Sequence, residues 1–152
     1  MDLNPRNAKE RFELTYRAVN RLTDVKRLIL YECDDWKPPD VPNRHQTSDP
    51  TAQAAIYRVD ELGDKLAALR VEEAELEGFI GETLAIISAV HDGFGEIYAL
   101  LLELRYVDGA TWAEIEERTG IKKSTGHYLL NIAFDWIDSV GVARVLSGQF
   151  EI

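Results

Sequence analysis

A short segment near the C-terminus carries the residues whose types and spacing could do chemistry. It combines two cations, two hydroxyl groups, an imidazole and a phenol: Lys122, Lys123, Ser124, Thr125, His127 and Tyr128. Lysine can pair with phosphates or with guanine acceptors, and serine and threonine can contact bases or phosphates. At the start of a helix, where backbone amides also attract phosphate, these side chains predict contacts with double-stranded DNA. Arg118 and Arg105 are candidate auxiliary phosphate contacts.

Catalytic and metal chemistry have no comparable cluster in the sequence. The histidines are far apart and lack the spacing of metal ligands: His45, His91 and His127. Asp34-Asp35 and Glu72-Glu73 are adjacent pairs, and adjacent residues on a helix do not converge on one point. Cys33, near a helix end, is expected to be buried or inert rather than reactive. We therefore expect no enzyme, no catalytic residue, no metal site and no cofactor.

Two predicted helices and a tight turn must position the candidate DNA contacts. The sequence Thr111-Trp112-Ala113-Glu114 has the form of a capping box, which predicts a helix start. Gly120 stands where the chain must turn sharply. The second helix is expected from about Lys123 into Phe134, with these buried positions: Leu129, Ile132, Ala133, Trp136 and Ile137. Residues 106–138 therefore predict a helix-turn-helix, the unit that places one helix in a DNA groove.

The residues around this unit resemble a known family. The stretch LLELRYVDGATWAEIEERTGIKKSTGHYLLNIAFDWI resembles region 4 of bacterial sigma factors. It is more similar to the C-terminal part of phage-encoded RinA/ArpU-type transcriptional regulators. In those proteins an arginine-tyrosine pair precedes a short glycine turn and a tryptophan, an order matched here by Arg105, Tyr106, Gly109 and Trp112. With the upstream SDPTAQAA, which follows a proline-rich break, the resemblance covers most of the chain. It implies a small helical DNA-binding protein that controls phage or prophage gene expression.

Three positions depart from the pattern of that family. Glu116 stands where a small residue, usually alanine, lets the two helices approach, and Lys122 stands where a serine or threonine cap is usual. Gly126 replaces the usual valine or isoleucine on the buried side of the second helix. We expect Gly126 to remove a core contact and to loosen this helix. The fold is expected to survive these changes, whereas tight DNA binding is less secure.

The charge of the chain also bears on DNA binding, because neutralising phosphates supplies much of the affinity. The formal net charge is −10, and residues 106–138 carry three basic and six acidic residues. Residues 1–30 carry seven basic and four acidic residues. We therefore expect DNA affinity to need a homodimer, the basic N-terminal helix, or host RNA polymerase as a co-binder.

The totals fit a globular protein, with 152 residues, 45% hydrophobic and 29% charged. No apolar run approaches the roughly 18 residues that span a bilayer. The N-terminal sequence MDLNPRNAKERFEL lacks the apolar core of a signal peptide. One cysteine excludes an internal disulfide. We expect a cytoplasmic protein with no membrane contact.

Helical periodicity extends over most of the chain, and no useful strand-like alternation is found, so the predicted fold class is all-α. A helix is expected over residues 7–35, with Asn7 as N-cap and Glu10 reaching back to it. Helix resumes near Asp49 or Pro50, with Ser48 or Asp49 as its cap, after the proline-rich sequence KPPDVPNRHQTSDP. A kink or break is expected near Gly78–Gly81, and a turn over residues 91–95. A mostly apolar helix is expected over 96–107 and ends at Asp108-Gly109.

A seven-residue stripe in the second predicted helix indicates packing along another helix. Its positions are Val59, Leu62, Leu66, Leu69, Glu73, Leu76, Ile80, Thr83, Ile87 and Val90. The stripe must be buried by the N-terminal helix, by another chain, or by both, and the long helices are predicted to form a coiled-coil-like hairpin or bundle.

Four parts are predicted along the chain. They are an N-terminal helix (1–36), a proline-rich connector (37–49), a long helical or oligomerisation segment (50–92) and a sigma region 4-like helix-turn-helix domain (93–152). The expected function is that of a phage-type transcriptional regulator that binds promoter DNA. Two alternatives are a packaging protein of the small-terminase type and a helix-turn-helix-fold interaction module that has lost DNA binding.

Overall fold

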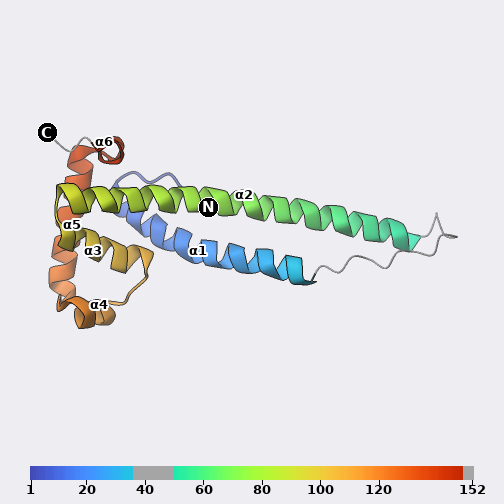
Figure 1. Cartoon of the computed structure of the whole chain (residues 1–152), viewed down its shortest axis with the longest axis horizontal. Coiled ribbons are helices and arrows are strands. Elements are labelled where there is room, and N and C mark those ends of the chain that lie inside the picture. Colours follow the sequence, from blue (N-terminus) through green and yellow to red (C-terminus); the bar gives the residue numbers. More distant parts are fainter. Residues whose placement is uncertain (36–49, 149–152) are drawn as a thin grey trace. The chain divides into compact units, whose positions relative to one another are not determined.

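The computed structural model describes the backbone of residues 1–35 and 50–148, and the side chains of residues 1–32 and 61–148. Every regular element in these ranges is helical, which confirms the predicted all-α class. The order is α1 (Ala8–Asp35), α2 (Pro50–Gly93), α3 (Glu96–Leu102), the π-helix η1 (Glu103–Val107), α4 (Trp112–Thr119), α5 (Lys123–Val140) and α6 (Val142–Leu146) (Figure 1). The predicted connector, with Ser48 and Asp49, lies outside the described residues, as does the side chain of Cys33. Among the described helices, none has the length and apolar character to cross a membrane.

The start of α1 is capped close to the predicted manner. The backbone amide of Glu10 donates to Asn7 Oδ1 at 2.9 Å, as expected for an N-cap asparagine. The Glu10 carboxylate accepts from the backbone amide of Arg6, also at 2.9 Å, and not from the amide of Asn7. The amide of Ala8 donates to Asp138 Oδ1 at 2.8 Å, which fixes the first turn of α1 against α5.

The chain divides into two compact units. The first unit contains Met1–Asn20 and Glu77–Ile152, and the second contains Arg21–Leu76. In each unit a stretch of α1 packs antiparallel to a stretch of α2, which is the hairpin pairing expected of the two long helices (Figure 1). The described stripe positions confirm this packing, because all are buried or half-buried: Leu62, Leu66, Leu69, Glu73, Leu76, Ile80, Thr83, Ile87 and Val90. Within each unit, α1 therefore lies along part of the stripe.

The second unit pairs α1 with α2 through a narrow apolar seam and two ion pairs. The buried seam consists of Val25, Ile29, Leu69 and Leu76. Arg21 donates two hydrogen bonds to the Glu72 carboxylate, at 2.6 and 3.0 Å, and this fork–fork contact lowers the pKa of Glu72. Lys65 Nζ lies 2.5 Å from Glu32 Oε1, and Glu32 is only 9% exposed. The two pairs fix the register of the helices within this unit.

The first unit contains the main core. Its largest fully buried apolar side chains come from all its long elements: Phe12, Ile86, Val90, Leu101, Leu102, Ile115, Leu130, Ile137 and Val145. Phe12 of α1 has its ring centroid 5.7 Å from the centroid of Tyr106 and 5.7 Å from that of Phe134. These contacts place the N-terminal part of α1 directly on η1 and α5.

A buried polar cluster joins α1 and α2 in the first unit. Thr83, the polar position of the stripe, is fully buried, and its hydroxyl lies 2.8 Å from that of Thr15. Arg11 donates from Nε to Thr83 Oγ1 at 3.3 Å and from Nη2 to Glu82 at 2.9 Å. Its guanidinium carbon lies 4.5 Å from the centre of the Phe79 ring. Every buried polar side-chain atom in the described part of the chain has a hydrogen-bond partner.

Two local predictions about α2 need correction: the helix does not break near Gly78–Gly81, and the turn that follows it is shorter than predicted. The helix runs without a break through Gly78 and Gly81. Packing of Leu76, Phe79 and Thr83 against other elements outweighs the roughly 1 kcal/mol that each glycine costs a helix. The predicted turn over residues 91–95 shrinks to Phe94 and Gly95, whose amides both donate to the Val90 carbonyl at 2.9 Å.

The helix predicted over 96–107 changes character partway along. Residues 96–102 form α3, and the chain then widens into the π-helix η1 over residues 103–107. The amide of Asp108 donates to the Glu103 carbonyl at 2.9 Å, and the amide of Ala110 donates to the Leu104 carbonyl at 2.8 Å. Gly109, at φ 69°, ends the segment as predicted. Single turns of π-helix are rare and often stand at functional sites.

Candidate nucleic-acid interface

Helix α4 begins at the predicted cap. Thr111 has extended backbone angles, and its Oγ1 accepts from the amide of Glu114 at 3.2 Å. The Glu114 carboxylate lies 3.2 Å from the same hydroxyl, so it does not reach back to the Thr111 amide as a full capping box would. Ile115 is the fully buried residue of this helix.

The connection between α4 and α5 is short and fixed by hydrogen bonds. Gly120 adopts the left-handed conformation at φ 76°, and its amide donates to the Glu116 carbonyl at 2.7 Å. The Thr119 hydroxyl donates to the Ile115 carbonyl at 2.7 Å and accepts from the Ile121 amide at 3.2 Å. Ile121 is half-buried against the core. These contacts set the direction in which α5 leaves the turn.

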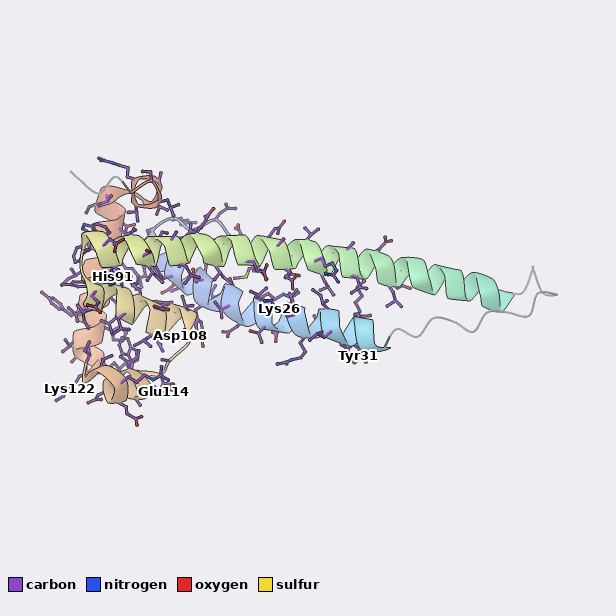
Figure 2. The ribbon with its side chains drawn as sticks, in the orientation of Figure 1. Lys26, Tyr31, His91, Asp108, Glu114 and Lys122 are labelled. Carbon is purple, nitrogen blue, oxygen red and sulfur yellow. The ribbon has the colours of Figure 1, made fainter. Side chains whose placement is uncertain are left out.

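The start of α5 presents the predicted contact residues to solvent. All six are exposed: Lys122, Lys123, Ser124, Thr125, His127 and Tyr128. Figure 2 marks Lys122 at the turn into α5 and Glu114 on α4. Within the described residues, the side chains of Lys122, Lys123 and Tyr128 form no hydrogen bond or ion pair. Lys122 is the N-cap and gives no side-chain cap, so no side chain satisfies the first amides of the helix.

The buried side of α5 lies one position away from part of the prediction. Ala133 and Ile137 are fully buried, as expected. Leu129, Ile132 and Trp136 are only half-buried, and Leu130 and Phe134 form the centre of the buried side instead. On that side Phe134 packs against Phe12 of α1, with ring centroids 5.7 Å apart. Ser124, Tyr128 and Asn131 share the opposite face, because they are four and three residues apart.

Gly126 provides space for an aromatic ring, which corrects the expectation that it removes a core contact. A Cβ atom at Gly126 would lie 2.2 Å from Cζ3 and 2.7 Å from Cη2 of Trp112. The indole therefore fills the volume that a valine or isoleucine would take. Its ring centroid lies 4.7 Å from that of His127, so the same ring supports a candidate contact residue. Glu116, the other departure at the helix crossing, is exposed, and its carboxylate reaches solvent.

The π-helix positions Arg105 beside the same tryptophan. Arg105 Nη1 donates to the Ala110 carbonyl at 3.1 Å, and the guanidinium carbon lies 5.3 Å from the centre of the Trp112 ring. The next residue, Tyr106, packs its ring 6.0 Å from that of Phe134. Burial raises the pKa of Tyr106; the nearby Glu13 carboxylate adds to the rise and Arg105 opposes it. Arg118, the other auxiliary candidate, is exposed in the last turn of α4.

A groove in the first unit runs between α1 and α5, with a volume of about 590 Å³. Its lining comes from three elements: Lys9, Glu13, Tyr16 and Arg17 of α1, Arg105 and Tyr106 of η1, and His127, Leu130, Asn131 and Phe134 of α5. Arg105 and His127 are candidate contacts predicted from the sequence, whereas Lys9, Arg17 and Asn131 were not among the predicted contacts. The spacing of Lys9, Glu13, Tyr16 and Arg17 predicts that they share one face of α1. That this face lies beside α5 depends on tertiary packing, which the spacing does not reveal.

Comparison with known proteins found no match among family models, curated proteins or solved structures.

Proposed function

We propose that this chain is a DNA-binding transcriptional regulator of the phage type, and that α4 and α5 act as its helix-turn-helix. The observation that carries the proposal is the first part of α5. There an exposed and uncapped helix start carries Lys122 and Lys123, beyond a left-handed turn at Gly120. The opposite side of the same helix is buried, so the helix is held rigidly with its polar face outward.

Each part of this surface fits a different part of DNA. The uncapped amides and the two lysines favour backbone phosphates. Ser124, Tyr128 and Asn131 share the solvent face, where side chains reach base edges, and asparagine can pair with adenine through two hydrogen bonds. Asp135 is exposed one turn beyond Asn131, so its charge confines the interface to the first turns of the helix.

The proposal includes help from outside this surface. The three basic and six acidic residues of segment 106–138 give a net charge of −3, which is poor for an isolated reader of DNA. A homodimer would double the contacts, and host RNA polymerase would add its own. The resemblance of Arg105, Tyr106, Gly109 and Trp112 to sigma region 4-like regulators supports either arrangement.

Reversal of the two lysine charges tests the proposal. Fluorescence anisotropy would measure binding to a duplex from the region flanking the protein's own gene, and to a shuffled duplex of equal composition. We expect the Lys122→Glu/Lys123→Glu protein to lose at least about tenfold in affinity for the first duplex. The control, Arg27→Glu/Arg70→Glu, has the same charge change at exposed positions of the second unit. Unchanged binding by the lysine variant, at low and at moderate salt, would contradict the proposal.

A protein-interaction module is the second candidate, because acidic residues are exposed around the reading helix: Glu116, Glu117 and Asp135. In that case the natural protein would bind neither duplex. The lysine reversals would then leave promoter output in cells unchanged.

A further inference from the structure

One face of α1 carries two cations with no described partner. Lys9, Glu13, Tyr16 and Arg17 are spaced as neighbours on one side of a helix, and all four line the groove beside α5. Within the described residues, neither the Lys9 nor the Arg17 side chain forms a hydrogen bond or ion pair. Burial elsewhere on α1 holds this face in place, because Ala8 and Phe12 are fully buried. The fold therefore fixes the position of Lys9 and Arg17, but the described residues give their charges no hydrogen bond or ion pair.

The facing wall of the groove belongs to the proposed DNA-binding helix. His127 and Asn131 line the groove and are also exposed on α5. Arg105 is the third permanent cation in the lining, and its guanidinium is oriented by the Ala110 carbonyl and the Trp112 ring. The groove is therefore continuous with the surface that carries Ser124 and Tyr128.

The charge and spacing of the lining indicate an extended anion. Three permanent cations and one carboxylate, Glu13, line the groove, although the chain as a whole has a net charge of −10. Lys9 and Arg17 stand about 12 Å apart along the helix, at roughly 1.5 Å per residue. Cations so spaced meet successive groups of a strand more readily than they enclose one small anion.

We infer that this groove holds the phosphates of one DNA strand beside the bases that α5 reads. Lys9 and Arg17 supply contacts from α1, and Arg105 supplies one from η1. The inference rests on the proposed function and deepens it. It assigns the N-terminal part of α1 a direct contact with DNA. It also accounts for DNA binding by a chain with a net negative charge, because Lys9, Arg17 and Arg105 line the same groove.

The salt dependence of DNA binding tests this inference. Each phosphate contact contributes about 0.9 to the slope of log affinity against log salt concentration. We expect the magnitude of this slope to be smaller by about two for the Lys9→Gln/Arg17→Gln protein. Its affinity should fall by equal factors for the duplex from the gene-flanking region and for the shuffled duplex. Arg27→Gln/Arg70→Gln is the matched control, since it removes the same charge at exposed positions outside the groove.

The outcomes separate this inference from the proposed function. If the natural protein binds neither duplex, the proposed function fails and the inference falls with it. Suppose that the natural protein binds DNA and the Lys122→Glu/Lys123→Glu protein does not. If Lys9→Gln/Arg17→Gln then has the same slope of log affinity against log salt concentration as the natural protein, the groove contact is overturned and the proposed function stands. Suppose instead that inorganic phosphate stabilises the natural protein but not Lys9→Gln/Arg17→Gln, while both have the same salt dependence of DNA affinity. That result would also overturn the inference, because the groove would then bind a small anion and not DNA. Thermal unfolding midpoints of all variants confirm that they are folded.

Discussion

At the scale of single residues, Gly126 and Trp112 form a complementary pair. A glycine in the interior of a helix costs about 1 kcal/mol, and here its missing side chain is replaced by the edge of an indole. That indole also contacts His127 and lies beneath the guanidinium of Arg105. The residue that departs from the expected pattern therefore has a structural role, because it allows one ring to support two residues of the proposed DNA surface.

Enlarging residue 126 should be destabilising. Gly126→Val places a side chain inside the Trp112 ring, and we expect the free energy of unfolding to fall by about 1–3 kcal/mol, as in other overpacked sites. Denaturant titration measures this change. Combining it with Trp112→Ala should cost less than the sum of the two single changes.

The matched control is another helical glycine. Gly81→Ala meets no atom within 4 Å, and we expect it to leave stability unchanged or to raise it by up to about 1 kcal/mol. Strictly additive effects of Gly126→Val and Trp112→Ala would show that the two residues are not coupled.

At the scale of elements, the two long helices are held by different means in the two units. In the first unit α1 contributes Phe12 to a shared core and Arg11 to a buried polar cluster. In the second unit only α1 and α2 are described, and their seam depends on few apolar residues and two ion pairs. Electrostatics should therefore matter more for the second unit.

The Arg21–Glu72 pair should make stability depend on pH. Hydrogen bonding to Arg21 lowers the pKa of Glu72 in the folded protein, so its contribution is present at neutral pH. That contribution is lost as the pH falls through the folded value, below the ordinary value of 4.5. Glu72→Gln should lower the urea midpoint at pH 7, and its difference from the natural protein should shrink on acidification below about pH 4.5.

Urea titrations from pH 7 to about pH 3 would follow that difference. Glu75→Gln is the control, since Glu75 is exposed on the same helix and has no described partner. A difference between Glu72→Gln and the natural protein that does not vary with pH would show that the carboxylate charge does not stabilise the fold.

At the scale of the whole molecule, the net charge and the exposed apolar side chains are the features behind our proposal of a partner. The net charge of the chain is −10, whereas the groove lining contains three permanent cations and one carboxylate. In the second unit, Leu30 is 63% exposed and Val71 is 59% exposed. Large apolar side chains on a helix pair with few buried residues are a reason to expect association of copies.

We expect a homodimer in solution, measured by light scattering coupled to size-exclusion chromatography. Leu30→Glu/Val71→Glu should reduce the mass to that of one chain, about 17.2 kDa, because it places charges at two exposed apolar positions. Leu84→Glu, at a position 41% exposed in the first unit, should leave the dimer intact. A large ring would favour the packaging alternative, and a monomeric natural protein would leave RNA polymerase as the expected co-binder.

The sequence by itself determined the elements whose causes are local. Asn7 and Thr111 cap helices with their own side chains, Gly109 and Gly120 adopt positive φ, and Pro50 opens α2. Such signals act within a few residues, so composition and spacing reveal them. The polar side chains at the start of α5 are likewise exposed, as their types suggest: Lys122, Lys123, Ser124, Thr125, His127 and Tyr128.

Only the tertiary structure decided which surfaces meet. Periodicity gives the faces of a helix but not its neighbours, so the contact of α1 with α5 and the groove between them could not be derived. The continuity of α2 through Gly78 and Gly81, and the indole beside Gly126, have the same origin. In each case a contact between residues distant in sequence outweighs a local preference of about 1 kcal/mol, and no local pattern records that contact.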